Sequence, residues 1–349
     1  MGDLRGRLGD AVAALGLPRI LIFAFLVLTW LVAALATDLP LPGLLRDSIV
    51  RTGQNGVLVL ALVPMVRAGS GLNFGLPLGI VCGLAGCVLA MERGLAGAPM
   101  LAVATLVSLP CAALAGLGYA LLLERVRGQE MMVGIYVGFG AVALASVAWL
   151  VAPVTSPDLI WPVGGRGVRY LVAVDSAFAV SISVWRPAGI AALVAVWLGA
   201  CALVALFSRT LAGASLDAAG QNERLALAAG IPVRRLRRLG VILSTVLAAF
   251  GIVIFTHGQG LLPLYKAPLL MALPAVAALL LGGATIARAS VWNAVVGTFL
   301  FQALLASGLP VVNALVHQSA QSAALKDFPE VARLIVANGI ILYALTRKG

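Results

Sequence analysis

The chain has 349 residues, of which 62% are hydrophobic and only 11% are charged, and its formal net charge is +11. Soluble domains carry charged residues at about a quarter of their positions, so this composition excludes an ordinary soluble domain. The positive charge does not indicate a nucleic-acid partner, because in membrane proteins Lys and Arg gather in the cytoplasmic loops.

The apolar residues come in blocks of about 17–25, the length that crosses roughly 30 Å of hydrocarbon as a helix. The sequence therefore predicts an all-α, polytopic membrane helix bundle that forms a single transmembrane domain over residues 1–349. We expect about ten spans. In chain order they are 20–36, 53–67, 73–91, 99–123, 132–152, 188–208, 239–256, 268–287, 291–309 and 331–346.

Basic residues set the expected orientation, because they concentrate between Arg209 and Arg238. The positive-inside rule places this segment, and with it both termini, in the cytoplasm. The segment 153–187 is then external. It holds Trp161 and Tyr170, which are typical of membrane interfaces. It is either a docking surface for an external partner or a structured connector.

The stretch "RAGSGLNFGLPLG" (67–79) combines helix-breaking residues at membrane depth. Freed backbone groups are tolerated there only beside protein or a watery cavity. A solute pathway is one interpretation, and a loop at the membrane surface is the other. The candidate pathway residues are Gly71, Asn73, Phe74 and Gly75. Gly71, Gly75, Gly79 and Gly83 also recur every fourth residue, which predicts close helix packing along one helix face.

A polar stretch from Leu216 to Gly240 separates two apolar runs. It predicts a short helix over about 216–229, with Ser215 as N-cap, a break at Gly220 and a stop at Gly230. Two faces are expected. Leu216, Ala219, Ala226 and Ala229 face the bundle, while Asp217, Gln221, Asn222, Glu223 and Arg224 face water. Such a helix either binds a cytoplasmic partner or lies on lipid headgroups through the arginines that follow it.

The same stretch resembles the cytoplasmic-loop signature of ATP-binding cassette (ABC) importer permeases of the branched-chain amino acid, simple-sugar and nucleoside class. The matching residues are Ala219-Gly220-Gln221-Asn222, then Ala228-Ala229-Gly230-Ile231, the arginines and Ser244. Thr245 departs from the usual glycine. The stretches "GLNFGLPLG" and "LLLGGATIARAS" are also similar to the family, and Glu130 is similar to a glutamate of its nucleoside branch.

The resemblance implies that the loop 209–238 is the coupling helix segment, seated on a separate ATP-binding subunit. The implied contact residues are Gly220, Gln221, Asn222, Glu223, Arg224 and Gly230. It also implies a second permease chain, identical or related, an external solute-binding protein and the bacterial cytoplasmic (inner) membrane. The chain has no Walker loop, so ATP and Mg²⁺ belong to the partner and no cofactor is expected here.

The residues indicate no enzyme and no metal site, because the four Cys and two His form no ligand pattern. An ion-coupled secondary transporter is the alternative from another class, but it usually needs carboxylates within the spans. Among solutes, a nucleoside or purine type is favoured first, simple sugars second and branched-chain amino acids third.

Overall fold

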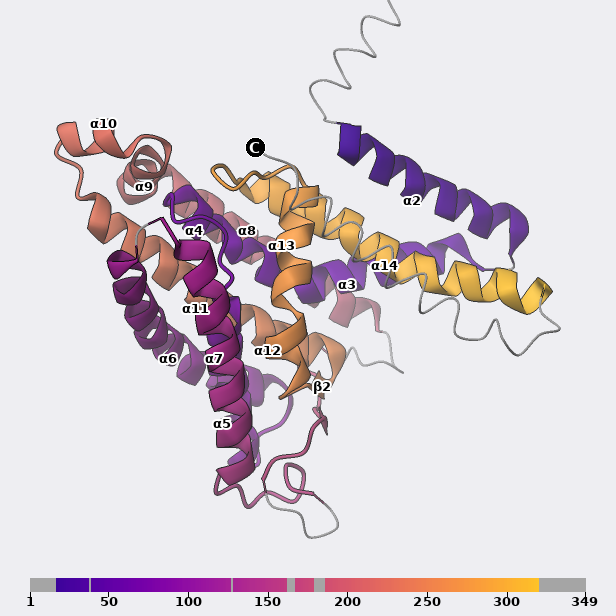
Figure 1. The fold of residues 1–349 in the computed structure, drawn as a ribbon. Helices are drawn as coiled ribbons and strands as arrows, with labels where there is room; N and C mark the ends of the chain where they lie inside the picture. The colour runs from indigo at the N-terminus through magenta and orange to yellow at the C-terminus, as the bar shows by residue number, and fades with distance from the viewer. Residues whose placement is uncertain (1–16, 38, 127, 162–166, 179–185, 320–349) are drawn as a thin grey trace, which may run out of the picture.

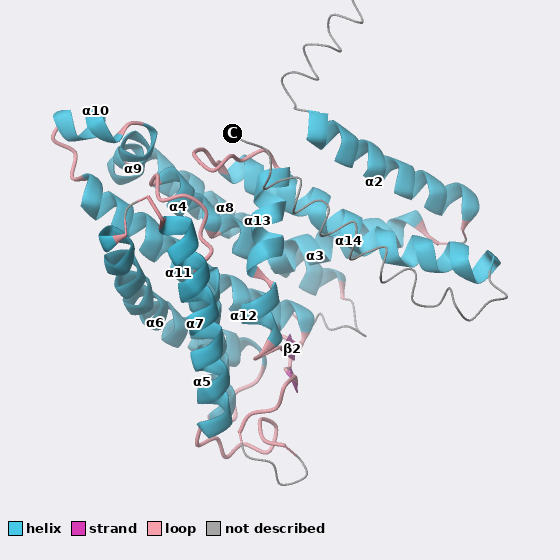
Figure 2. Cartoon of the chain, in the orientation of Figure 1, coloured by secondary structure: helices cyan, strands magenta, loops and turns pink. Residues whose placement is uncertain are grey.

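The computed structural model describes residues 17–37, 39–126, 128–161, 167–178 and 186–319. These residues form a helical bundle with one short antiparallel strand pair (Figures 1 and 2). The elements are α2 (Leu17–Ala36), α3 (Leu41–Leu60), α4 (Leu62–Arg67), α5 (Leu76–Glu92), α6 (Gly97–Arg125), α7 (Glu130–Val151), β1 (Val172–Ala173), α8 (Pro187–Arg209), α9 (Leu211–Gln221), α10 (Glu223–Ala228), α11 (Val233–Gln259), β2 (Leu261–Leu262), α12 (Lys266–Leu270), α13 (Ala272–Leu281) and α14 (Val291–Ser319).

Within the part of the chain that the structure describes, six helices are long and apolar enough to cross a membrane. They are Leu41–Arg67, Gly97–Arg125, Glu130–Val151, Pro187–Arg209, Val233–Gln259 and Val291–Ala314. Shorter apolar helices cover Ile22–Leu35, Leu76–Glu92 and Lys266–Leu281. These nine segments overlap the first nine predicted spans, while 331–346 lies outside the described residues. The multi-pass, all-α architecture is as expected, and the count of ten remains a prediction.

Two predicted boundaries are wrong. The second span begins at Leu41 instead of residue 53, because Pro40 and Pro42 start a helix whose first turns carry charged residues that lower its hydropathy. The eighth span ends at Leu281 instead of residue 287. There, Gly283 has a φ of 91°, a left-handed conformation that favours glycine and ends the helix.

Helix α11 is central to the bundle and packs against α3, α4, α5 and α6. Its 27 residues extend about 40 Å, enough to cross the hydrocarbon core. Glycines on the neighbouring helices allow close approach: a Cβ on Gly83 of α5 would lie 2.5 Å from the Ala249 carbonyl oxygen of α11. Any larger residue at Gly83 would push these two helices apart.

The turn between α4 and α5 confirms the predicted interruption near residues 68–75. Gly69 and Gly71 there have φ angles of 71° and 75°. The predicted four-glycine helix face is wrong, because α5 begins at Leu76 and leaves Gly71 and Gly75 outside it. Only Gly79 and Gly83 lie on the α5 face that contacts α11.

At the C-terminal end of α11, the described part of the 153–187 segment is hydrogen-bonded to the bundle. β1 pairs with β2, with Val172 opposite Leu262, and the Val174 backbone N–H donates to the Gly260 carbonyl at 3.0 Å. The rings of Tyr170 and Tyr265 stack with centroids 6.0 Å apart. We call this the β2 end of the bundle, and the end with α9 and α10 the α9 end (Figure 1).

Large apolar side chains cover the outer helices. Leu35, Leu106, Leu144 and Leu203 are each at least 70% exposed, on α2, α6, α7 and α8 respectively. Exposed leucines at this density are typical of a surface that faces lipid. The core is formed instead by α3, α4 and α11 with the helices packed on them.

Candidate functional site

The first candidate site is the pair of short helices α9 and α10, which we call the platform (Leu211–Ala228). Thr210 caps α9 by accepting from the Gly213 N–H, so the predicted cap at Ser215 is wrong. The chain breaks at Asn222 instead of Gly220, because the Asn222 side chain accepts from the Leu225 N–H at 3.0 Å and starts α10. Gly230, with a φ of 76°, ends the segment as predicted.

Arg67, the last residue of α4, joins the platform to the spans. Its guanidinium forms a bidentate ion pair with Asp217 of α9, with Nε 2.6 Å from Oδ1, and it also hydrogen-bonds the Ser208 hydroxyl. The Arg67 and Asp217 side chains are 19% and 26% exposed. Asp217 was expected to face water, and this is wrong: it holds α9 against α4. Bidentate Arg–carboxylate pairs fix geometry as well as adding energy.

Gly220 lies where α9 contacts the α4–α5 turn. A Cβ at this position would overlap the carbonyl oxygen of Arg67 and lie 2.9 Å from the Gly69 nitrogen. Beneath this contact lies a small apolar cluster formed by Ala68, Leu216, Ala219, Ala226, Val233 and Leu236. The platform is therefore fixed to α4 by an ion pair, a glycine contact and an apolar layer.

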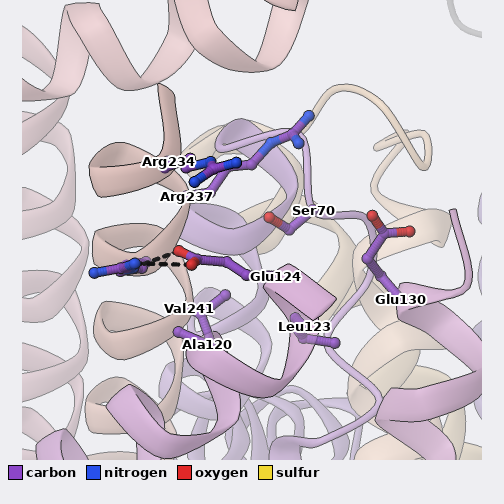
Figure 3. Close-up of a pocket in the computed structure, with 9 residues that line it drawn as sticks. Ser70, Ala120, Leu123, Glu124, Glu130, Arg234, Arg237 and Val241 are labelled. Carbon is purple, nitrogen blue, oxygen red and sulfur yellow. Dashed lines mark hydrogen bonds and ion pairs between the residues drawn. The ribbon is translucent and has the colours of Figure 1, made fainter. Parts of the chain in front are cut away.

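A small hollow opens beside the platform, where α6 ends and α7 and α11 begin (Figure 3). Arg237 of α11 pairs with Glu223 of α10 at 3.1 Å, and Arg238 forms two hydrogen bonds with Glu124 of α6. Glu130 of α7 lies across the hollow from Glu124 (Figure 3). These pairs connect α10 through α11 to α6. Arg237 and Arg238 thus have protein partners, and the expected contact of the arginines with lipid headgroups stays a prediction.

The predicted partner-contact residues differ in exposure. Gln221, Asn222 and Arg224 are exposed, and Glu223 is half-buried. Leu225 and Leu227 of α10 are 68% and 57% exposed. The outer face of the platform is therefore partly apolar. Ala229 was expected to face the bundle and is exposed instead. A mixed polar and apolar face of this kind is suited to contact with another protein.

The predicted pathway residues lie in the α4–α5 turn near the α9 end. Asn73 is fully buried, and its Nδ2 donates to the Ser244 hydroxyl of α11 at 2.7 Å. Phe74 packs against the main core. A Cβ on Gly75 would lie 2.7 Å from the Tyr119 ring. Whether these residues line a pathway stays a prediction, and none of them lines the larger cavity described next.

The second candidate site is a cavity of about 220 Å³ between α3, α11, the α12–α13 pair and α14. Its polar lining residues are Arg51, Gln54, Asn55, Gln259 and Gln302. Gln302 is 7% exposed and Gln54 is 4% exposed. Most of the remaining lining is apolar and includes Phe255 and Phe301. A few convergent polar groups in an apolar cavity are typical of a small-molecule site.

This cavity is not among the sites predicted from the sequence. A signal was present, because amide and guanidinium side chains are costly inside spans and mark functional positions there. Three of them, Arg51, Gln54 and Asn55, occur within five residues of one helix. The predicted second span began at residue 53 and cut through this group, and Gln302 was treated as part of an apolar block.

The fold and these two sites define a class: a polytopic helical membrane protein with a cavity between its helices and a helical platform fixed to its spans. The sequence profile of the branched-chain amino acid transport system permease component family matches residues 45–345. The chain belongs to this family, and is therefore a permease subunit of the ABC transporter class. Proteins of this family work with ATPase and solute-binding partners. No curated protein and no solved structure gave a match.

Proposed function

We propose that this chain is the transmembrane permease of an ABC importer, and that its platform is the coupling element that receives the movement of a separate ATP-binding subunit. The observation that carries this is the attachment of Asp217 to Arg67, which ties the exposed helices to the end of α4. Since a rigid attachment transmits displacement, movement of the platform shifts α4 and the turn that follows it.

The platform has a second connection, to the helix that borders the cavity. Glu223 pairs with Arg237 in the second turn of α11, and α11 continues to Gln259 at the cavity. One helix therefore links the site of ATP-driven movement with the proposed solute site. We infer that a tilt of α11 opens and closes the cavity toward the two sides of the membrane in turn.

The proposed assembly has two permease chains and two ATPase subunits. One chain offers one platform, whereas two ATPase subunits close around two nucleotides, so a second permease chain is needed. ATP and Mg²⁺ are held by the ATPase subunits in this proposal. An external binding protein delivers the solute at the β2 end, where the described part of the 153–187 segment contacts α11 through β1 and β2.

The proposed location is the bacterial cytoplasmic membrane, with the α9 end and both termini in the cytoplasm. The arginines of the α9 end support this orientation. For the solute, we propose a nucleoside or purine type first and a simple sugar second. A branched-chain amino acid, the solute named in the family description, comes third.

Co-purification tests the proposal. The tagged chain, expressed with the gene products encoded beside it, should purify with an ATPase that has a Walker loop, at two copies of each. The reconstituted complex should take up solute only with ATP and the binding protein. Full transport by a complex with one permease chain and one ATPase would contradict the assembly. Uptake driven by a proton or sodium gradient without ATP would contradict the function.

A further inference from the structure

The hollow beside the platform (Figure 3) contains a buried hydrogen-bond donor that lacks an acceptor. The polar side chains that line it include Arg234 and Arg237 of α11, Ser70 of the α4–α5 turn and Glu130 of α7. Arg237 pairs with Glu223 through Nη2 at 3.1 Å, while its Nε is buried and has no partner among the described residues. Buried N–H groups nearly always have an acceptor, so this one indicates an acceptor that a bound molecule brings.

Two opposite charges line the same hollow and form no ion pair with a described residue. Arg234 is exposed, and Glu130, in the first turn of α7, is half-buried. Neither takes part in the ion pairs between described residues. The other two lining arginines are already paired, with Glu124 and Glu223. A ligand that complements the hollow therefore carries one negative and one positive group.

The size of the hollow limits what enters it. Its volume is about 20 Å³, and a single water needs roughly 10–15 Å³, so it receives one or two oxygen atoms and not a whole solute. Ser70 is 7% exposed and lies between Glu124 and Glu130 in Figure 3, where its hydroxyl can donate to such an oxygen. The ligand therefore enters with one end, and the rest of it stays outside.

The surroundings of the hollow indicate the surface of the membrane. It lies where α6 ends at Arg125 and α7 begins at Glu130. Large side chains beside it on these two helices are exposed: Leu121, Leu122, Met132, Ile135 and Tyr136. Charged residues at the ends of apolar spans lie at the level of the headgroups, and basic pockets between spans bind phospholipid headgroups. A lipid can thus reach the hollow while its acyl chains remain against α6 and α7.

We propose that the hollow binds the headgroup of a phospholipid that carries both a phosphate and a primary ammonium, of the phosphatidylethanolamine type. Arg234, Arg237 and Ser70 donate to the phosphate oxygens, because guanidinium and hydroxyl groups are suited to that acceptor. Glu130 accepts from the ammonium across the hollow. Such binding requires neither a transported solute nor ATP, so its test is independent of the proposed function.

The same charges disfavour other ligands. Phosphatidylglycerol and cardiolipin bring no cation for Glu130 and place their negative charge beside its carboxylate. Phosphatidylcholine has a quaternary ammonium without N–H groups, so Glu130 has no hydrogen to accept. Free phosphate contacts the arginines alone and gains nothing from the apolar side chains of α6 and α7.

The test measures lipid binding to the full chain, purified with the partners that accompany it and then delipidated. Native mass spectrometry follows titrations with phosphatidylethanolamine, phosphatidylcholine, phosphatidylglycerol and cardiolipin of the same acyl composition. Inorganic phosphate is added as a competitor. We expect the tightest site to take phosphatidylethanolamine, at one lipid per permease chain, and phosphate to leave it bound.

Two variants address the two charges. Arg234→Gln should weaken the binding of every phospholipid about 10-fold, because it removes a charge-assisted hydrogen bond to the phosphate that they share. Glu130→Gln should weaken phosphatidylethanolamine by a similar factor and remove its preference over phosphatidylcholine. Arg235→Gln is the matched control, since Arg235 is an exposed arginine of the same helix turn that does not line the hollow. Equal melting temperatures of the three variants check that the fold is intact.

Each outcome supports or overturns one part of the assignment. A preference for phosphatidylglycerol or cardiolipin would overturn the headgroup class. Displacement of the lipid by inorganic phosphate would show a site for a free anion. Unchanged binding in both Arg234→Gln and Glu130→Gln, or equal losses in Arg234→Gln and Arg235→Gln, would overturn the site itself. Failure of the chain to assemble with any ATPase would contradict only the proposed function.

Discussion

Arg67 and Asp217 are 150 residues apart in the sequence, and their side chains form a bidentate ion pair between the end of α4 and the middle of α9. Arg67 also hydrogen-bonds Ser208 near the end of α8. One guanidinium therefore holds together a membrane helix, the platform and the helix that leads to it. Its loss should loosen the platform without disturbing the apolar core.

Asp217→Asn should impair transport more than folding. The change keeps the side-chain volume but removes the charge, and charge-assisted hydrogen bonds of this type are worth about 1.5–3 kcal/mol. We expect normal membrane levels, a melting temperature lowered by a few degrees, and uptake reduced at least about 10-fold. Uptake in proteoliposomes and thermal melting of the purified complex measure the two effects.

The charge swap is the control for this pair. Arg67→Asp combined with Asp217→Arg keeps one positive and one negative group at the contact, so it should recover part of the activity that each single change removes. If the double variant is no better than the worse single variant, the ion pair does not carry the coupling.

Gly220→Ala should weaken the attachment of the platform to the α4–α5 turn. A Cβ there would overlap the Arg67 carbonyl oxygen, and overpacking of this kind costs about 1–3 kcal/mol. Gly118→Ala is a matched control, because a Cβ at Gly118 of α6 meets nothing within 4 Å. The melting temperature should fall for Gly220→Ala and stay level for Gly118→Ala. Equal effects in the two variants would show that the contact at Gly220 does not hold the platform against the α4–α5 turn.

Changes at Asn222 and Glu223 of the platform should disconnect the ATPase subunit from the spans. Glu223→Arg reverses a charge that pairs with Arg237, and Asn222→Arg adds bulk and removes the α10 cap. Both variants should reach the membrane and lose uptake. Substrate-stimulated ATP hydrolysis should fall with it. Arg235→Ala, at an exposed arginine beyond the platform, should do much less.

Asn222→Asp separates capping from contact, because aspartate is also a good N-cap. If this variant transports normally while Asn222→Ala does not, the requirement is for the cap, which is worth about 1 kcal/mol.

Normal transport by both Asn222→Arg and Glu223→Arg would show that the platform is not the coupling element.

Cysteine labelling should place the two ends of the bundle on opposite sides of the membrane. Gln221 and Asp158 are both exposed, at the α9 and β2 ends respectively. In a Cys111→Ser background, which removes the exposed native thiol, a membrane-impermeant maleimide should label Asp158→Cys in intact cells and Gln221→Cys only after lysis. Labelling of Gln221→Cys in intact cells would show that the α9 end is external and would contradict the predicted topology.

Most of the fold could be predicted from hydropathy, because a chain that must make all its backbone hydrogen bonds internally in lipid forms helices of a fixed minimum length. The start of α3 could not be predicted in this way. Arg46, Asp47 and Arg51 make its first turns look like a loop, and only packing against α8 and α14 shows that they belong to a helix.

The candidate sites were predicted unequally. The platform was found because a polar helix between apolar runs is conspicuous, but the partner of Asp217 was not, since nothing in one sequence links it to Arg67. The cavity was missed for a similar reason. Its polar residues come from α3, α11 and α14, and their convergence depends on helix orientations that periodicity alone does not fix.

Site-specific cross-linking from the platform tests the central claim most directly. A photoreactive amino acid placed at Gln221 or Arg224, in cells that express the whole transporter, should form a covalent adduct with the ATPase subunit. The same amino acid at Asp158, at the β2 end, should give no such adduct. An ATPase adduct from Asp158, or none from either platform position in an actively transporting complex, would contradict the account.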